Sequence, residues 1–224
     1  MTTTLNTSTQ PPKLFRPLTP IPLIHHTPRL LLLAASRALL TAELHKPHLF
    51  GKLLGAALPA EWPPGEYDPD AMRYFLAQLE AGGPAATGWY GWYALRKAEG
   101  SVPRTLIGAG GFLGPPDAEG TAEIGFSLAA GWRGQGLGTE LVGGLVAQAA
   151  ATGRVRQLLA HTGAGNGAAR GVLLRNGFAA AAGETDEARL RFVRVVVPTP
   201  APAMPTGPDG PTGAAGAAGR AALS

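Results

Sequence analysis

Hydrophobic positions change their spacing several times along the chain, which predicts alternating strands and helices. Short apolar or alternating runs predict strands at 28–33, 89–95, 105–113, 121–128, 155–160, 178–182 and 189–197. Apolar residues three and four positions apart predict helices: one capped by Ser36 and interrupted at Pro47, others over 48–57, from Asp68 or Asp70 to Gly82, and over 136–151 and 166–175. This order predicts a mixed α/β domain in which three consecutive strands form a meander.

Both ends of the chain lack this periodicity. Residues 1–27 are polar and then Pro-rich, so we expect a leader that is partly disordered. Residues 198–224 are rich in Pro, Gly and Ala and cannot bury enough apolar surface to offset the entropy of ordering, so we expect a flexible tail. The folded unit is then a single domain over 28–197.

The composition is compatible with a sizeable core and excludes several kinds of site. Of the 224 residues, 45% are hydrophobic, 15% are charged and none is Cys. A chain without Cys has no disulfide, no thiolate metal ligand and no Cys nucleophile, and we expect no bound metal. The N-terminus lacks a secretory signal, the longest apolar stretch is too short for a bilayer, and the net charge of +4 comes without a basic block. We therefore expect a cytoplasmic protein that binds neither membranes nor nucleic acid.

A glycine-rich turn between the strand 121–128 and the helix 136–151 carries the clearest chemical signal. Its glycines stand at positions 131, 134, 136 and 138. Glycines let the backbone approach a ligand closely, and a turn that enters a helix presents successive N–H groups that favour phosphate. Arg133 adds a cation and Thr139 a hydroxyl donor. A turn that only joins a strand to a helix is the alternative.

Two phosphate-binding motifs do not fit this turn. A Walker loop needs Gly-Lys-Ser/Thr, and no Lys follows Lys97. A dinucleotide-binding turn needs G-x-G-x-x-G and an acidic residue about 20 positions later. The glycines here read G-x-G-x-G, and no Asp or Glu lies between Glu140 and Glu184. The motif that remains is R-x-x-G-x-G, which begins at Arg133.

This motif and a second segment resemble the GNAT family of N-acetyltransferases. The sequence RGQGLGTE, beginning at Arg133, is similar to the family's acetyl-CoA motif. The segment 158–178, in which Asn166 precedes a short helix and Gly177-Phe178 follows it, is similar to the downstream element of the family. AEIGFSL and TPRLLL add a likeness to the branch of ribosomal-protein Nα-acetyltransferases. The resemblance spans 27–197, is specific from 120 to 180 and is loose from 34 to 100.

The resemblance implies the GNAT fold, a central mixed sheet of about seven mostly antiparallel, twisted strands, flanked by helices and splayed between its fourth and fifth strands. It also implies acetyl-CoA as the cosubstrate, with pantetheine pairing along one strand of the splay and the phosphates on the glycine turn. Five Arg and one acidic residue lie between 133 and 175, so we expect one or two arginines to contact phosphate. The expected cofactor-binding residues are Phe126, Ser127, Leu128, Arg133, Gly134, Gln135, Gly136, Leu137, Gly138, Thr139, Asn166 and Arg170.

Direct attack of an amine on the thioester is the economical route in a chain without Cys, and it needs a base. Glu123 is the candidate, because strand alternation puts it with Gly125 and Ser127 on one face beside the splay. An exposed or ion-paired strand Glu is the alternative. His161, on the facing strand, is a second titratable group, although a structural His is the commoner case. Many relatives carry a Tyr as general acid where this chain has Leu173, so the acid is unassigned and a water can protonate the thiolate.

The expected acceptor is a primary amine, either a peptide or protein N-terminus or a small amine. Residues 48–83 carry Glu61, Glu66, Asp68 and Asp70, which attract a cationic amine if they line the acceptor side. A plain surface loop is the alternative. A non-catalytic sensor that binds acyl-CoA is the alternative function. The oligomeric state stays open between a monomer and a homodimer.

Overall fold

A single sheet organises the part of the chain that the computed structural model describes, residues 23–181, 189–197 and 199. Its strand order is β1-β2-β3-β4-β5-β6-β8-β7. The strands are β1 (Ile24–His26), β2 (Leu30–Ala34), β3 (Trp92–Arg96), β4 (Thr105–Phe112), β5 (Thr121–Leu128), β6 (Gln157–Gly163), β7 (Ala179–Ala180) and β8 (Arg189–Val195). The helices are α1 (Arg37–His45), α2 (Pro47–Leu54), α3 (Pro69–Gly82), α4 (Leu137–Ala151) and α5 (Gly167–Arg175), with short 3-10 turns at Gly83–Ala86 and Ala130–Trp132.

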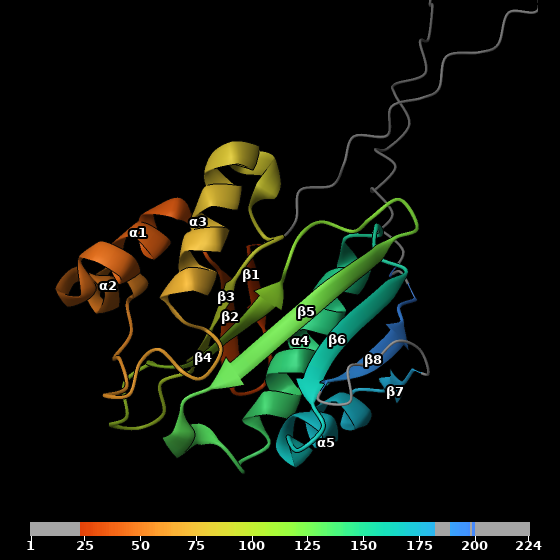
Figure 1. Cartoon of the computed structure of the whole chain (residues 1–224). Helices are drawn as coiled ribbons and strands as arrows, with labels where there is room; N and C mark the ends of the chain where they lie inside the picture. Colours follow the sequence, from red (N-terminus) through yellow and green to blue (C-terminus); the bar gives the residue numbers. More distant parts are fainter. Residues whose placement is uncertain (1–22, 182–188, 198, 200–224) are drawn as a thin grey trace, which may run out of the picture.

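Helices cover both faces of this sheet (Figure 1). On one face Phe50 of α2 packs against Tyr93 of β3, with ring centroids 5.4 Å apart. On the other face Gly144 of α4 lies so close to β2 that an added Cβ would come within 2.5 Å of the Leu32 side chain. All neighbouring strands run antiparallel except β5 and β6, which are parallel. The predicted fold class, a mixed and mostly antiparallel sheet flanked by helices, is confirmed.

Local sequence explains where the helices begin. The Ser36 side chain accepts a hydrogen bond from the backbone N–H of Leu39 at 3.2 Å and caps α1. Asp68, rather than Asp70, caps α3. Pro47 does end the first helix, but it also starts α2, because proline lacks only an N–H that the first turn of a helix leaves unpaired.

Helix α4 anchors the glycine turn to the core. The predicted stripe of Leu137, Leu141, Leu145 and Ala149 is buried throughout, with at most 2% of any of these side chains exposed. The helix packs beneath β2, β4 and β5. The N-terminal end of α4 is therefore fixed beside the last residues of β5.

The sheet has one strand more than expected. Residues 24–26 fall in the segment assigned to the leader, yet they pair antiparallel with β2, His25 standing opposite Leu32. Three residues flanked by prolines show no alternation, so the strand has no signal in the hydrophobic pattern. Because of this extra strand, the expected gap between the fourth and fifth strands lies between β5 and β6.

Other boundaries also shift. β3 begins at Trp92 instead of Trp89, since the chain turns at Gly88 and Gly91, which both have positive φ. The predicted strand 178–182 is reduced to the two residues of β7. The structure does not describe residues 1–22, 182–188, 198 and 200–224. The expectations of a partly disordered leader and of a flexible tail therefore fall almost entirely outside the described residues.

Candidate active site

The sheet opens where β5 and β6 diverge (Figure 1). Of the two strands, only Thr121–Glu123 of β5 and Gln157–Leu159 of β6 pair with each other. Beyond that point β5 pairs with β4 as far as Leu128, and β6 pairs with β8 as far as Gly163. The edge of β5 that faces β6 therefore has no ladder partner over 124–128 among the described residues. Such an edge offers backbone donors and acceptors to an extended ligand.

The glycine turn lies at the open end of this gap. Gly134 and Gly136 have φ of +75° and +76°, a left-handed backbone that a side chain disfavours. Gly136 is the N-cap of α4 and provides no capping side chain, so Leu137, Gly138 and Thr139 present their N–H groups at an uncapped helix terminus. The positive end of the helix dipole and these donors suit an anion.

Two polar side chains of the turn hold the turn itself. Arg133 donates from Nε to the carbonyl oxygen of Leu128 at 2.9 Å, and Gln135 donates from Nε2 to the carbonyl oxygen of Gly131 at 3.1 Å. Both residues are exposed, and the Nη groups of Arg133 extend beyond this contact. Arg133 therefore closes the turn while leaving part of its guanidinium for a ligand.

Asn166 and Arg170 stand on the other side of the gap, after β6. Asn166 caps α5 by accepting a hydrogen bond from the backbone N–H of Ala169 at 3.0 Å. Arg170 donates to the carbonyl oxygen of Ala164 at 3.3 Å. Both residues are exposed, Asn166 at the N-cap and Arg170 in the first turns of α5.

Glu123 and His161 meet across the point where the strands separate. His161 Nδ1 lies 2.8 Å from Glu123 Oε1. Both side chains are about one-third exposed, at 35% for Glu123 and 30% for His161. The alternation expected for β5 is confirmed, because Ala122 and Ile124 are buried on the opposite face. A carboxylate paired with an imidazole beside an open sheet edge can accept and relay a proton.

Leu173 is fully buried in α5. This position therefore contributes packing and no proton donor.

A loop over 55–68 covers part of the same sheet face. A Cβ on Gly65 would lie 2.7 Å from Ser127 Oγ, so the loop backbone touches β5 beside the gap. From α3, Tyr74 donates to the carbonyl oxygen of Leu113 at 3.2 Å, and the Leu113 N–H donates to the carbonyl oxygen of Glu123 at 2.9 Å. The segment expected to line the acceptor side thus reaches the surroundings of Glu123.

Glu43 is a structural residue that the sequence analysis missed. It is 9% exposed in α1. Its Oε1 accepts from Trp62 Nε1 at 2.7 Å, and its Oε2 accepts from the hydroxyls of Tyr67 at 2.8 Å and Tyr93 at 2.6 Å. Burial raises the pKa of Glu43, although the three hydrogen bonds act in the opposite direction. A Glu three positions after the buried Leu40, on the apolar stripe of a helix, was the available signal.

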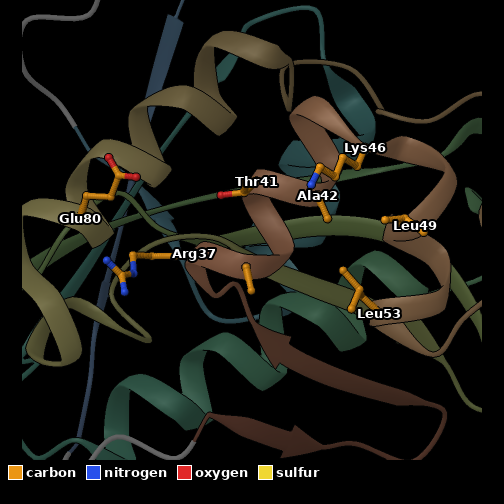
Figure 2. A pocket seen from close by; sticks show the side chains of 8 residues that line it. Arg37, Thr41, Ala42, Lys46, Leu49, Leu53 and Glu80 are labelled. Atoms are coloured by element: carbon orange, nitrogen blue, oxygen red, sulfur yellow. The ribbon is translucent and has the colours of Figure 1, made fainter.

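A hollow of about 480 Å³ lies elsewhere, between α1, α2 and α3. Figure 2 shows Arg37 and Glu80 reaching toward it from α1 and α3, with Lys46 and Leu53 on its other side. It contains none of the residues expected to bind a cofactor. The gap between β5 and β6 is therefore the better candidate for the reaction site.

In the described ranges, no group of three or more His, Cys, Asp or Glu side chains is placed to hold a metal ion. None of the described helices combines the length and hydropathy that crossing a bilayer requires.

Comparisons with known proteins identify the family of the chain and proteins that share its fold. The family model described as "Acetyltransferase (GNAT) domain" matches residues 37–179. No curated protein matches the chain. Among solved structures, RimL, a ribosomal L7/L12 α-N-protein acetyltransferase in complex with coenzyme A, is 18% identical with a TM-score of 0.52, over 79% of this chain and 97% of that one. An acetyltransferase from Salmonella typhimurium that modifies the N-terminal serine of L7/L12 is 19% identical with a TM-score of 0.51, over 79% and 98%.

Proposed function

Because the chain belongs to the acetyltransferase (GNAT) domain family, we propose that it transfers an acetyl group from acetyl-CoA to a primary amine. The carrying observation is that the gap between β5 and β6 leads directly to the glycine turn at the start of α4. A free strand edge suits a chain with amide groups, and an uncapped helix terminus suits an anion. Acetyl-CoA has both parts, pantetheine and pyrophosphate, and RimL, which shares the fold, was solved with coenzyme A.

The proposed binding mode assigns a role to each expected residue. The backbone of 126–128 pairs with pantetheine, and the N–H groups of 136–139 bind the pyrophosphate. Gly134 keeps the backbone open to the ligand, and Gln135 and Arg133 stabilise the turn, the latter with its free Nη groups toward phosphate. Asn166 and Arg170 frame the far side.

In the proposed reaction Glu123 takes a proton from the acceptor ammonium, directly or through a water. The free amine then attacks the thioester carbonyl carbon, a C–N bond forms, and the C–S bond breaks. CoA leaves as a thiolate, and the second proton of the attacking nitrogen reaches this thiolate through water, which leaves a neutral amide and a free thiol. His161 holds the Glu123 carboxylate at 2.8 Å and passes the proton onward. No step involves an acyl-enzyme on Cys, because the chain has none.

We propose a peptide or protein N-terminus as the first acceptor to test, ahead of small amines. Two observations support this choice. The RimL structures share the fold, and the acidic residues Glu61, Glu66 and Asp68 lie exposed in the loop that touches Ser127. A negative rim attracts a cationic amine. We assign catalysis to the domain over 28–197, with β1 added at its edge. We also propose that the protein is cytoplasmic, because a chain without Cys suits a reducing compartment.

A panel of amines, assayed by release of free thiol from acetyl-CoA, tests the proposal. The panel includes Ser- and Ala-starting peptides, polyamines, amino acids and aminoglycosides. Thermal unfolding with CoA and with NAD runs in parallel, because a ligand that binds only the native state raises its stability. We expect stabilisation by CoA alone and turnover of at least one peptide. Stabilisation by CoA without turnover of any amine favours a sensor instead, and stabilisation by NAD alone rejects the cofactor.

A further inference from the structure

The turn between β1 and β2 meets the first turn of α4. Glu140 Oε1 accepts from Thr27 Oγ1 and from the Arg29 backbone N–H, both at 2.6 Å. Glu140 Oε2 accepts from Arg29 Nε at 2.7 Å. Arg29 Nη1 also donates to the carbonyl oxygen of Gln135 at 3.0 Å. One arginine from the N-terminal edge of the sheet thus joins the first turn of α4 to the glycine turn.

The β1–β2 turn that carries Arg29 is also held by hydrogen bonds from Lys97. Lys97 of the segment after β3 donates from Nζ to the carbonyl oxygens of Thr27 and Pro28, and its backbone N–H donates to the carbonyl oxygen of Arg29. Thr27 and Leu30 are also joined by a backbone hydrogen bond at 3.0 Å. The β1–β2 turn is therefore also held by contacts that do not involve Glu140.

The charges at this contact suit a neighbouring anion. A carboxylate in the first turn of α4 would repel phosphate if it stood alone. Burial by itself raises the pKa of Glu140, but hydrogen bonds from Thr27 and Arg29, together with the charge of Arg29, more than offset this and lower it. Glu140 is thus held as a paired anion whose lone pairs face Thr27 and Arg29.

The guanidinium also lies against the glycines. A Cβ on Gly136 would be 3.5 Å from Arg29 Nη2. Gln135 precedes this glycine, so fixing its carbonyl oxygen fixes the peptide plane that carries the Gly136 N–H. The orientation of the donors that enter α4 then depends on Arg29.

We propose that Arg29 is a positioning residue for the acetyl-CoA turn, with Glu140 as its support. Arg29 holds the Gln135 carbonyl so that the N–H groups after it keep the orientation that pyrophosphate needs. This inference rests on the proposed function. It concerns a residue outside the R-x-x-G-x-G motif, about a hundred positions earlier in the chain.

Steady-state kinetics and binding of CoA to the full chain test this role. Arg29→Met keeps the side-chain stem and removes both side-chain hydrogen bonds, to Glu140 and to the Gln135 carbonyl oxygen, whereas Arg29→Lys keeps the charge but cannot serve Glu140 and Gln135 together. We expect Arg29→Met to raise the Kd for CoA and the KM for acetyl-CoA about tenfold, with kcat at saturation within about twofold. Arg29→Lys should recover part of the loss. Arg73→Met, which breaks an exposed ion pair with Asp70 on α3, is the matched control and should change neither constant.

The outcomes separate this inference from the proposed function. If the wild type binds no CoA, both fail. If the wild type binds CoA and Arg29→Met binds it equally well, only the positioning role fails. A loss of kcat without a change in KM also rejects it, because positioning of a binding turn acts on binding. Thermal unfolding of each variant without ligand separates lost positioning from lost folding. If Arg29→Met does not fold, the KM of Arg29→Lys for acetyl-CoA decides, and a KM equal to that of the wild type rejects the positioning role.

Discussion

The proposed cofactor side and the proposed acceptor side of the site each contain one glutamate held by hydrogen bonds, and the pKa values of the two shift in opposite directions. On the cofactor side Glu140 receives its hydrogen bonds from a hydroxyl, a backbone N–H and a guanidinium, and its pKa is lowered. On the acceptor side Glu43 receives its hydrogen bonds from two phenols and an indole, and its pKa is raised. Burial is the largest cause at Glu43 and outweighs its three neutral donors, whereas at Glu140 the hydrogen bonds from Thr27 and Arg29, with the charge of Arg29, outweigh burial.

The difference suits what each side is proposed to bind. An anionic pyrophosphate tolerates a neighbouring carboxylate only if a cation accompanies it, which Arg29 provides. The acceptor side receives a cationic amine, so a carboxylate held by neutral groups there creates no conflict. Glu43 also joins α1 to the 55–68 loop through Trp62 and Tyr67, and this loop touches Ser127.

Glu123 stands between these two sides, and its removal should have the largest effect. We expect Glu123→Gln to lower kcat about 10²- to 10⁴-fold, the usual worth of a general base, with the KM for acetyl-CoA nearly unchanged. The amide keeps the shape and a contact with His161 but cannot take the proton. Thiol-release kinetics with the best peptide of the panel measure this. Activity within a few-fold of the wild type would show that Glu123 is an ordinary paired strand residue.

Glu43→Ala should separate the two sides most clearly. Its removal leaves Trp62, Tyr67 and Tyr93 with buried donors and no acceptor, which costs roughly 2–4 kcal/mol of unfolding free energy. We expect the KM for the acceptor to rise while the Kd for CoA stays the same. Urea unfolding and CoA titration check both statements. An equal loss on the cofactor side contradicts the division into two separately held regions.

The milder Glu43→Gln variant guards against a chain that no longer folds. It keeps an acceptor oxygen and the side-chain volume. A rise in acceptor KM that is smaller than in the alanine variant is expected, and an unchanged KM in both variants rejects a role for Glu43 in holding the acceptor loop.

Gly136→Ala tests the cofactor side by itself. A Cβ at φ +76° costs on the order of 1–2 kcal/mol, and it also presses toward the Arg29 guanidinium. We expect weaker CoA binding by up to about tenfold and an unchanged acceptor KM. Gly153→Ala is the control, because that glycine also has a positive φ, with open space around it and no link to the turn. Equal effects of the two substitutions on CoA binding would show that only backbone strain matters.

The same contrast explains why the residues of the proposed cofactor side could be predicted from the sequence and those of the proposed acceptor side could not. The cofactor side depends on glycines and an arginine at fixed spacing in one continuous segment, and this segment predicted the turn and the helix after it. The gap beside β5 was expected only from the resemblance to the GNAT family. The acceptor side depends on Glu43, Trp62, Tyr67 and Tyr93, which come together only after α1, the loop and β3 have packed. No local pattern links such residues, and the burial of one glutamate is decided by the tertiary structure. Arg29 and Glu140 escaped notice for the same reason.

The contributions of the two carboxylates to the unfolding free energy should depend on pH with opposite signs. Glu43 has a raised pKa in the folded chain, so the folded state binds its proton more tightly than the unfolded state, where the pKa is about 4.5. The unfolding free energy therefore falls as pH rises from about 4.5 through the raised value. Glu140 has a lowered pKa, so its contribution is complete above about 4.5 and is lost as pH falls through the lowered value.

Urea unfolding of the wild type, Glu43→Gln and Glu140→Gln between pH 3 and pH 8 measures these two slopes, which we expect to be the smallest of the effects. Relative to the wild type, Glu43→Gln should remove a decrease in stability on the alkaline side of pH 4.5, and Glu140→Gln a decrease on its acid side. Each variant is the control for the other, since both replace a hydrogen-bonded carboxylate by an amide. Changes of the same sign would contradict the opposite pKa directions of the two carboxylates. Opposite signs would agree with burial as the dominant cause at Glu43 and with the hydrogen bonds from Thr27 and Arg29 as the dominant cause at Glu140.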